Sequence, residues 1–212
     1  MRALIACLLL CRAAPIAAQQ TFDRTLSVQQ GGKEIGREDY TLKPGLRTGA
    51  SVITARARYP ASSPTLQIGM TQERAPDGGI AKFELDVQAP EGNVVILAAG
   101  SGARLIVRSV SKGSEAGREL PGGHDIVLLD DRVFSLYLAL ADVATAAGAR
   151  VVAVYPRGAR RATILARRES GPDGATIQFS GDVTGTLAVD SQGHLQRLEL
   201  PSAGIVVTPA GK

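Results

Sequence analysis

The sequence predicts a mainly β fold: a curved antiparallel sheet of about eleven or twelve strands, shaped as a half-barrel, with one amphipathic helix packed on its concave face. Three observations predict this fold. Apolar and polar residues alternate along most of the chain, and glycine- and proline-containing turns separate the alternating segments. One later segment has the helical period instead. The 24 glycines among 212 residues agree with a chain that turns often.

Composition limits the class of protein. Hydrophobic residues make up 44% of the chain and charged residues 21%, which is enough apolar surface for one packed domain. No stretch of about 20 apolar residues occurs, so we do not expect an integral membrane protein. No linker longer than a turn divides the chain, and residues 19–212 are therefore expected to form a single domain.

The alternation is clearest from Ala81 to Ala89. Ala81, Phe83, Leu85, Val87 and Ala89 point one way, and the polar residues between them point the other. Leu66, Ile68 and Met70 repeat the pattern in the preceding segment. Each such segment is expected to be a strand with one buried and one wet face. The spacing of about 10 to 14 residues between turns is typical of an antiparallel meander.

One segment, residues 131–147, has the period of a helix. Its apolar stripe is broad enough to pack against the sheet and contains Val133, Phe134, Tyr137, Leu138, Leu140, Ala141 and Ala144. Asp130 or Asp131 is expected to cap the helix start, and Gly148 suits the position just after its end. Residues 112–125 are the longest irregular stretch. We expect a surface loop there, with a lid at a cavity mouth as the alternative.

The N-terminus resembles a secretory signal peptide, residues 1–18. Arg2 precedes a nine-residue apolar segment, Ala3–Cys11, and small residues then allow cleavage after Ala18. Export predicts a periplasmic or secreted protein. The alternatives are an uncleaved anchor, a mis-set start codon, or a lipoprotein signal, since Leu4-Ile5-Ala6-Cys7 resembles a lipobox. Cys7 and Cys11 both fall inside the signal, so the mature chain would have no disulfide and no thiolate metal site.

Charge does not favour nucleic-acid binding. The whole chain has a net charge of +4, which falls to +2 once the signal with its two arginines is removed. Its arginine runs alternate with apolar residues, as on a solvated strand face, and no aromatic residues are interleaved with them. We therefore expect no nucleic-acid partner.

No catalytic or metal-binding constellation stands out. The two histidines, His124 and His194, are not at ligand spacing from another His, Cys or acidic pair. Ser109-Val110-Ser111-Lys112 matches S-x-x-K, but it ends a strand, where positions i and i+3 face opposite ways. Phosphate-binding and nucleophile-elbow motifs are absent from the sequence. We expect no catalytic residues, no metal and no cofactor.

Three segments carry a family resemblance. They are Gly32-Lys33-Glu34-Ile35-Gly36 with Tyr40 and Leu42, Val127-Leu128-Leu129-Asp130-Asp131 running into the helix, and Leu187 to Pro201 near the C-terminus. In this order they resemble a bacterial periplasmic half-barrel family of unknown function, similar in shape to lipoprotein-carrier proteins of the LolA and LolB kind. The resemblance implies an apolar hollow between sheet and helix, which in the carriers takes acyl chains.

These observations favour an exported, non-catalytic binding protein that holds an apolar ligand or a lipidated partner between sheet and helix. The expected lining residues are Leu66, Ile68, Phe83, Leu85, Val87, Phe134, Tyr137 and Leu138. One alternative is a structural or envelope-assembly protein that acts through contacts with other envelope proteins. Another is a hydrolase acting through Ser101, Ser109 or His124.

Overall fold

The computed structural model describes residues 23–211, and these form one sheet of fifteen strands. The expected signal peptide lies outside the described residues. The strands are β1 (Arg24–Gln30), β2 (Lys33–Pro44), β3 (Ser51–Tyr59), β4 (Leu66–Arg74), β5 (Ile80–Gln88), β6 (Val94–Ser101), β7 (Arg104–Ser111), β8 (Ser114–Pro121), β9 (Ile126–Leu128), β10 (Ala149–Tyr155), β11 (Arg160–Gly171), β12 (Gly174–Gly181), β13 (Gly185–Asp190), β14 (Leu195–Leu200) and β15 (Ile205–Pro209). A short 3-10 turn, η2 (Pro201–Ala203), joins the last two strands.

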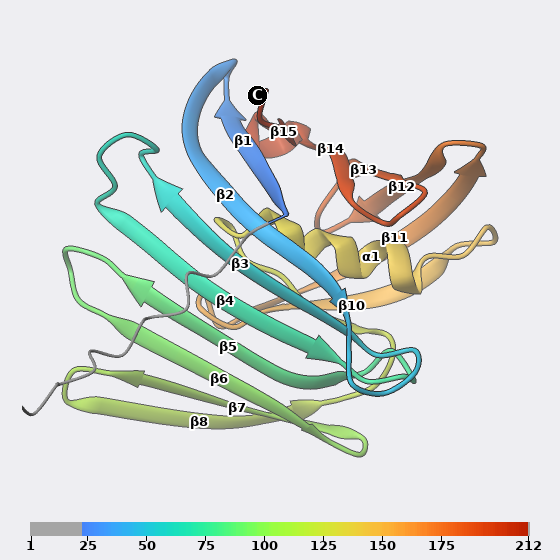
Figure 1. Ribbon diagram of the computed structural model, residues 1–212. Helices are drawn as coiled ribbons and strands as arrows, with labels where there is room; N and C mark the ends of the chain where they lie inside the picture. Colours follow the sequence, from blue (N-terminus) through green and yellow to red (C-terminus); the bar gives the residue numbers. More distant parts are fainter. Residues whose placement is uncertain (1–22, 212) are drawn as a thin grey trace, which may run out of the picture.

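The sheet is a meander whose two halves meet at the chain ends. Strands β8 to β1 follow one another in space, β15 pairs with β1, and β14 to β9 continue to the other edge. Neighbouring strands are antiparallel except β9 and β10, which are parallel because the helical segment lies between them in the chain. The sheet curves strongly around that segment and nearly closes into a barrel, with β8 and β9 as its edges (Figure 1).

The predicted mainly β architecture with one helix on the concave face is therefore confirmed. The prediction of about eleven or twelve strands is too low. One missed strand is β8, which falls in the stretch 112–125 that was expected to be a loop. Seven of its eight residues are exposed, so no apolar alternation marks it. It is held as a strand by its pairing with β7, from Arg104–Pro121 to Ser111–Ser114.

The helical segment is shorter than the predicted 131–147. A 3-10 turn, η1 (Phe134–Tyr137), leads directly into α1 (Leu138–Val143). The chain becomes extended at Ala144, and the Thr145 carbonyl then accepts the N–H of Arg168 at 2.9 Å. This contact draws residues after Val143 alongside β11 and ends the helix. Gly148, with φ +93°, lies in the turn before β10 and does not cap the helix.

The start of the segment is also capped differently from the prediction. The Glu38 carboxylate on β2 accepts the N–H groups of Phe134 at 2.6 Å and Ser135 at 2.9 Å. Asp130 instead accepts the Arg132 N–H and forms a two-pronged pair with Arg157 at 2.8 and 2.9 Å. The capping group thus comes from a distant strand, which ties the helical segment to the sheet.

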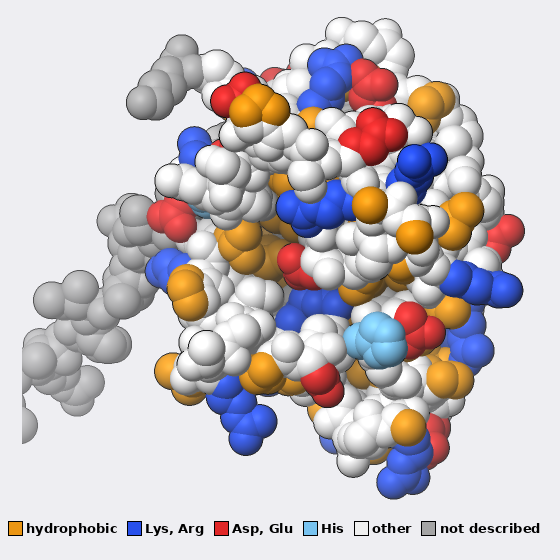
Figure 2. Space-filling model, turned by 90° about the vertical axis from the view of Figure 1, so that its right-hand side faces the viewer, with side chains coloured by type: hydrophobic (Ala, Val, Ile, Leu, Met, Phe, Trp, Pro, Cys, Tyr) orange, Lys and Arg blue, Asp and Glu red, His pale blue; other side chains and the backbone are white. Residues whose placement is uncertain are grey.

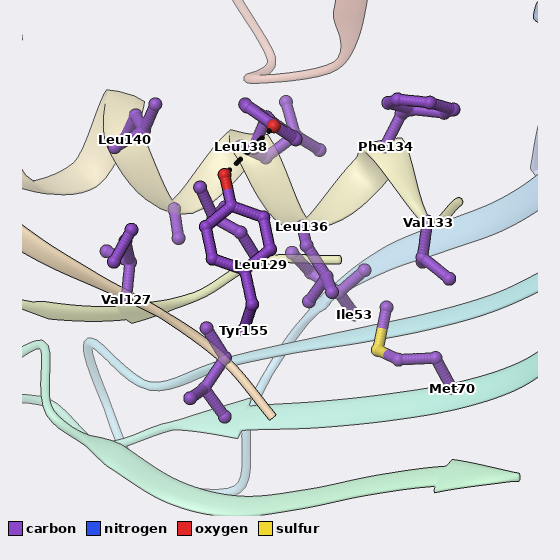
Figure 3. Packing of buried hydrophobic residues seen from close by; sticks show 14 of the residues in the cluster. Ile53, Met70, Val127, Leu129, Val133, Phe134, Leu136, Leu138, Leu140 and Tyr155 are labelled. Carbon is purple, nitrogen blue, oxygen red and sulfur yellow. Dashed lines mark hydrogen bonds between the residues drawn. The ribbon is translucent and has the colours of Figure 1, made fainter. Parts of the chain in front are cut away.

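The core lies between the helical segment and the concave face of the sheet (Figure 3). Every residue from Val133 to Ala141 is buried, because the sheet curves around the segment on more than one side. In the close view, Ile53 and Met70 lie on the sheet below Leu136 and Val133. The hydroxyls of Tyr137 and Tyr155 lie 3.4 Å apart inside this core. The described part of the chain contains no helix long and apolar enough to cross a membrane.

Glu38 makes the stability of the fold dependent on pH. Burial raises the pKa of its carboxyl from 4.5 to about 7, against the opposing effect of its hydrogen bonds. Between pH 4.5 and about pH 7, Glu38 is protonated in the folded protein and ionised in the unfolded chain. The Glu38 contribution to stability is therefore full below about pH 4.5 and is lost as pH rises to about 7.

We expect Glu38→Gln to remove this dependence. Urea unfolding of both proteins should be measured from pH 4.5 to pH 8. The free energy of unfolding of the wild type, relative to that of Glu38→Gln, should fall by about 3 kcal/mol across this range. Glu84→Gln, on the outer face of β5, is the control and should follow the wild type. A constant difference between wild type and Glu38→Gln would contradict the assignment.

Candidate functional site

The candidate site is a cleft of about 710 Å³ at the end of the barrel where α1 ends. Four chain segments form it: the β2–β3 connection, the last turn of α1, and the turns β11–β12 and β13–β14. Figure 2 shows a hollowed face of the molecule on which hydrophobic, basic and acidic side chains meet around the hollow. The volume is typical of small-molecule sites, which measure about 300 to 1,000 Å³.

One wall of the cleft is apolar. It is formed on the sheet by Leu42, Ile53 and Val189, and on the helix by Leu138 and Ala141. These side chains come from the two layers that enclose the core, so the core opens to the surface at this cleft. The helical segment stops at Val143 and leaves this end of the sheet uncovered.

Two turns shape the rim. In the β13–β14 turn, the Asp190 carboxylate accepts the N–H groups of Gln192 at 2.9 Å and His194 at 2.8 Å. Although partial burial opposes it, these hydrogen bonds hold the pKa of Asp190 below its usual value. At the start of β12, Gly174 lies so close to β13 that a Cβ there would collide with the Val189 carbonyl. The rim is therefore set by local chain geometry.

Charged groups surround the end of α1. Arg168 of β11 donates from Nη1 to the Ala141 carbonyl at 2.7 Å and so satisfies one of the last carbonyls of the helix. Asp142, also in the last turn, lines the cleft, and 56% of its side chain is exposed. One of its carboxylate oxygens lies 3.8 Å from Nε of Arg74 on β4.

Behind this wall β4 places two buried polar side chains. Gln72 is opposite Ile53, and Arg74 is opposite Ser51, and both of these β3 residues line the cleft. Gln72 is fully buried and only 2% of Arg74 is exposed. Arg74 Nη2 donates to the Gly78 carbonyl in the β4–β5 turn. Burial lowers the pKa of Arg74, and the nearby carboxylates of Asp142 and Asp77 oppose this effect.

Several polar atoms of this pair lack hydrogen bonds. Across residues 23–211, no group bonds to either amide atom of Gln72 or to Nε and Nη1 of Arg74. Leaving one buried polar atom unpaired costs about 1 to 3 kcal/mol. Nε of Arg58 and Oγ of Ser135, which do not line the cleft, are also without partners within the same range. Each such group calls for an explanation, such as a bound water, an ion or a functional role.

The predicted lining residues are mostly in the core. Seven of the eight are at most 4% exposed and belong to the core between sheet and helix: Ile68, Phe83, Leu85, Val87, Phe134, Tyr137 and Leu138. Leu138 alone among the eight lines the large cleft. Leu66 lines a second cleft of about 410 Å³ at the opposite end of the barrel, beside Tyr59 and Arg132.

Gln72 and Arg74 were missed by sequence reasoning, although a signal exists. The alternation that buries Ile68 and Met70 continues in phase to both residues. At these two inward positions the strand carries a glutamine and an arginine where the pattern calls for apolar residues. Polar residues at buried positions are expected more often at functional sites.

The residues of the hydrolase alternative do not gather at this cleft. Ser101 is exposed at the end of β6, His124 is exposed in the β8–β9 connection, and Ser109 is opposite Ile96 within the β6–β7 hairpin. Among residues 23–211, no serine hydroxyl is hydrogen-bonded to a histidine. His194 instead faces Asp190 at 3.5 Å and Arg24 at 3.4 Å.

Comparisons with known proteins place the chain near one solved structure. No protein-family model and no curated protein matches it. Among solved structures it is similar to a DUF1089 family protein from Pseudomonas aeruginosa, with 14% sequence identity and a TM-score of 0.49. The match covers 95% of this chain and 98% of the other. At this identity and TM-score the likeness carries no argument about function. Similarity to lipoprotein carriers is not shown and stays an expectation.

A substitution at Gln72 tests how much its unpaired amide atoms lower the free energy of unfolding. We expect Gln72→Met, which has similar volume and no polar atoms, to raise the free energy of unfolding by about 1 to 2 kcal/mol, because two unpaired buried atoms are removed. Gln67→Met, at an exposed position of the same strand, is the control and should change stability by less than about 0.5 kcal/mol. Both are measured by urea denaturation. Destabilisation by Gln72→Met would mean that the amide is satisfied in the folded protein.

Proposed function

We propose that this is an exported, non-catalytic binding protein that holds an apolar small molecule, such as a lipid, in the cleft at the end of the barrel. The observation that carries the proposal is an open cleft of about 710 Å³ with an apolar wall, where the core between sheet and helix reaches the surface through Leu138 and Ile53. Apolar walls with a few polar groups are the usual lining of small-molecule sites.

The dense packing of the core favours the cleft, rather than the middle of the barrel, as the place where a ligand binds. The side chains at the middle, among them Phe83, Leu85 and Phe134, are at most 1% exposed and fill the space between the layers. Placing a ligand among them would require the core to be displaced, and dense cores resist such changes. A ligand in the cleft still touches both layers, as the sequence-based hypothesis requires.

The absence of a hydrolytic constellation supports a non-catalytic role. A serine nucleophile needs a base within hydrogen-bonding reach. In the described range, Ser51, Ser170 and Ser191 line the cleft, and no histidine is hydrogen-bonded to any of them. Binding without chemical conversion is the simpler use of this geometry.

A second candidate is a structural or envelope-assembly role, and the β8 edge favours it. β8 pairs with β7 on one side only, and its side chains are almost all exposed. Ile106 and Val110 of the adjoining β7 are exposed hydrophobic residues. An open sheet edge can pair with a strand of another chain. Specific cross-linking of β8 to another envelope protein, with no small molecule bound, would favour this role.

Native mass spectrometry tests export and binding together. The full chain is expressed in a bacterium and purified from the periplasm without detergent. We expect a polypeptide that begins at Gln19 and carries an added mass that organic extraction removes. A bare mass from folded protein would contradict binding, and recovery of the uncleaved chain from the cytoplasm would contradict export.

Ser51→Trp tests the position of the site. A tryptophan at this half-buried residue of the cleft wall would fill part of the space. We expect it to weaken binding of the neutral fluorescent probe N-phenyl-1-naphthylamine by at least about tenfold, while Thr65→Trp, beside the smaller cleft at the opposite end, binds as the wild type does. Weakening by Thr65→Trp alone would move the site to the smaller cleft.

A further inference from the structure

We propose that the ligand of this cleft is amphipathic, with an anionic oxygen group such as a carboxylate that is bound by Arg74 and Gln72. This inference rests on the proposed function and specifies the class of ligand. A purely apolar molecule would need neither residue, because the apolar wall of Leu42, Ile53 and Leu138 would be sufficient to hold it.

The position of the pair supports this inference. Antiparallel partners point to the same side of a sheet, so Arg74 and Gln72 lie directly beside Ser51 and Ile53 on the concave face. Arg74 is also in contact with the cleft through Asp142, whose carboxylate lies 3.8 Å from Nε. A ligand in the cleft is thus separated from the guanidinium by the Asp142 side chain.

Most of the unpaired atoms of this pair are hydrogen-bond donors, which call for an acceptor. Arg74 has unpaired donors at Nε and Nη1, and Nε2 of Gln72 adds two N–H donors, while Oε1 of Gln72 is the one unpaired acceptor of the pair. A guanidinium has no acceptor atoms, so only an acceptor can satisfy it, and a charged acceptor does so most strongly. The cleft lining holds two basic residues, Lys43 and Arg168, and two acidic residues, Asp142 and Asp190, so the buried guanidinium of Arg74 is the charge that favours an anion.

Asp142 is the internal competitor for this position. Its distance of 3.8 Å from Nε is longer than a hydrogen bond, and more than half of its side chain is exposed. The carboxylate can therefore rotate into solvent as a ligand anion takes its place beside Arg74. This arrangement keeps the buried guanidinium paired with a negative charge in both the free and the bound protein.

The role of Asp142 predicts two variants of opposite effect. Removing the competitor in Asp142→Asn should tighten binding of an anionic ligand, whereas removing the guanidinium in Arg74→Gln should weaken it. A residue that only supports the fold would change the affinity for charged and neutral ligands alike.

The experiment compares dodecanoate with dodecanol, which share one apolar chain, by displacement of the bound fluorescent probe at pH 8. We expect the wild type to prefer dodecanoate by about tenfold to a hundredfold, the range that a charge-assisted hydrogen bond supplies. Arg74→Gln should remove that preference, and Gln72→Met should reduce it. Asp142→Asn should increase the dodecanoate affinity severalfold and leave that for dodecanol unchanged. Arg108→Gln, on the outer face of β7, is the control and should match the wild type.

The outcomes separate this inference from the function on which it rests. If the wild type binds dodecanol and dodecanoate equally and Asp142→Asn changes neither affinity, the inference is wrong while the apolar cleft stands. If neither compound displaces the probe from the cleft, the proposed function itself fails. Should Arg74→Gln fail to fold, the wild-type preference and the effect of Asp142→Asn still decide between these outcomes.

Discussion

The hydrogen bonds from Phe134 and Ser135 to the buried Glu38 carboxylate determine where the helical segment lies inside the sheet. They fix its start near the end of the barrel opposite the large cleft. From there ten residues, Phe134–Val143, reach the other end, where Arg168 holds the last turn through the Ala141 carbonyl. Because the segment is held at both ends, its length decides how much of the concave face is covered, and the cleft is the part that it does not cover.

The buried polar side chains of the interior differ in how completely they are hydrogen-bonded. Glu38 is buried, and its carboxylate accepts two N–H groups that hold the start of the helical segment. Its burial raises the pKa of the carboxyl. Gln72 and Arg74 are equally buried but have atoms without partners in the described chain. Arg58 Nε and Ser135 Oγ are also without partners in the described chain, but Gln72 and Arg74 are the unpaired residues that lie opposite lining residues of the large cleft, and for this reason we propose that they serve a ligand.

Much of the fold could be predicted from the sequence, and the site could not. Alternation in segments such as Ala81–Ala89 identifies strands, because a half-buried strand must show period two. The same rule fails for β8, because both faces of this strand are exposed to solvent. The helix predicted from the sequence is too long because Thr145 pairs with Arg167 of β11, a tertiary contact that the local sequence does not reveal. The expected lining residues, Phe83 and Leu85 among them, are correctly inward-facing, but burial alone does not distinguish a core from a cavity. Only packing in three dimensions shows that the core opens at Leu138 and Ile53.

The central claim is that a ligand binds at the open end of the barrel and leaves the middle of the core unchanged. The most direct measurement is a nuclear magnetic resonance titration of the isotope-labelled protein with dodecanoate, followed residue by residue. The account predicts that the amide shifts concentrate on residues 49–53, 138–142, 168–174 and 189–193, which surround the cleft. Shifts centred instead on Phe83, Leu85 and Val87, with the cleft residues unchanged, would contradict it.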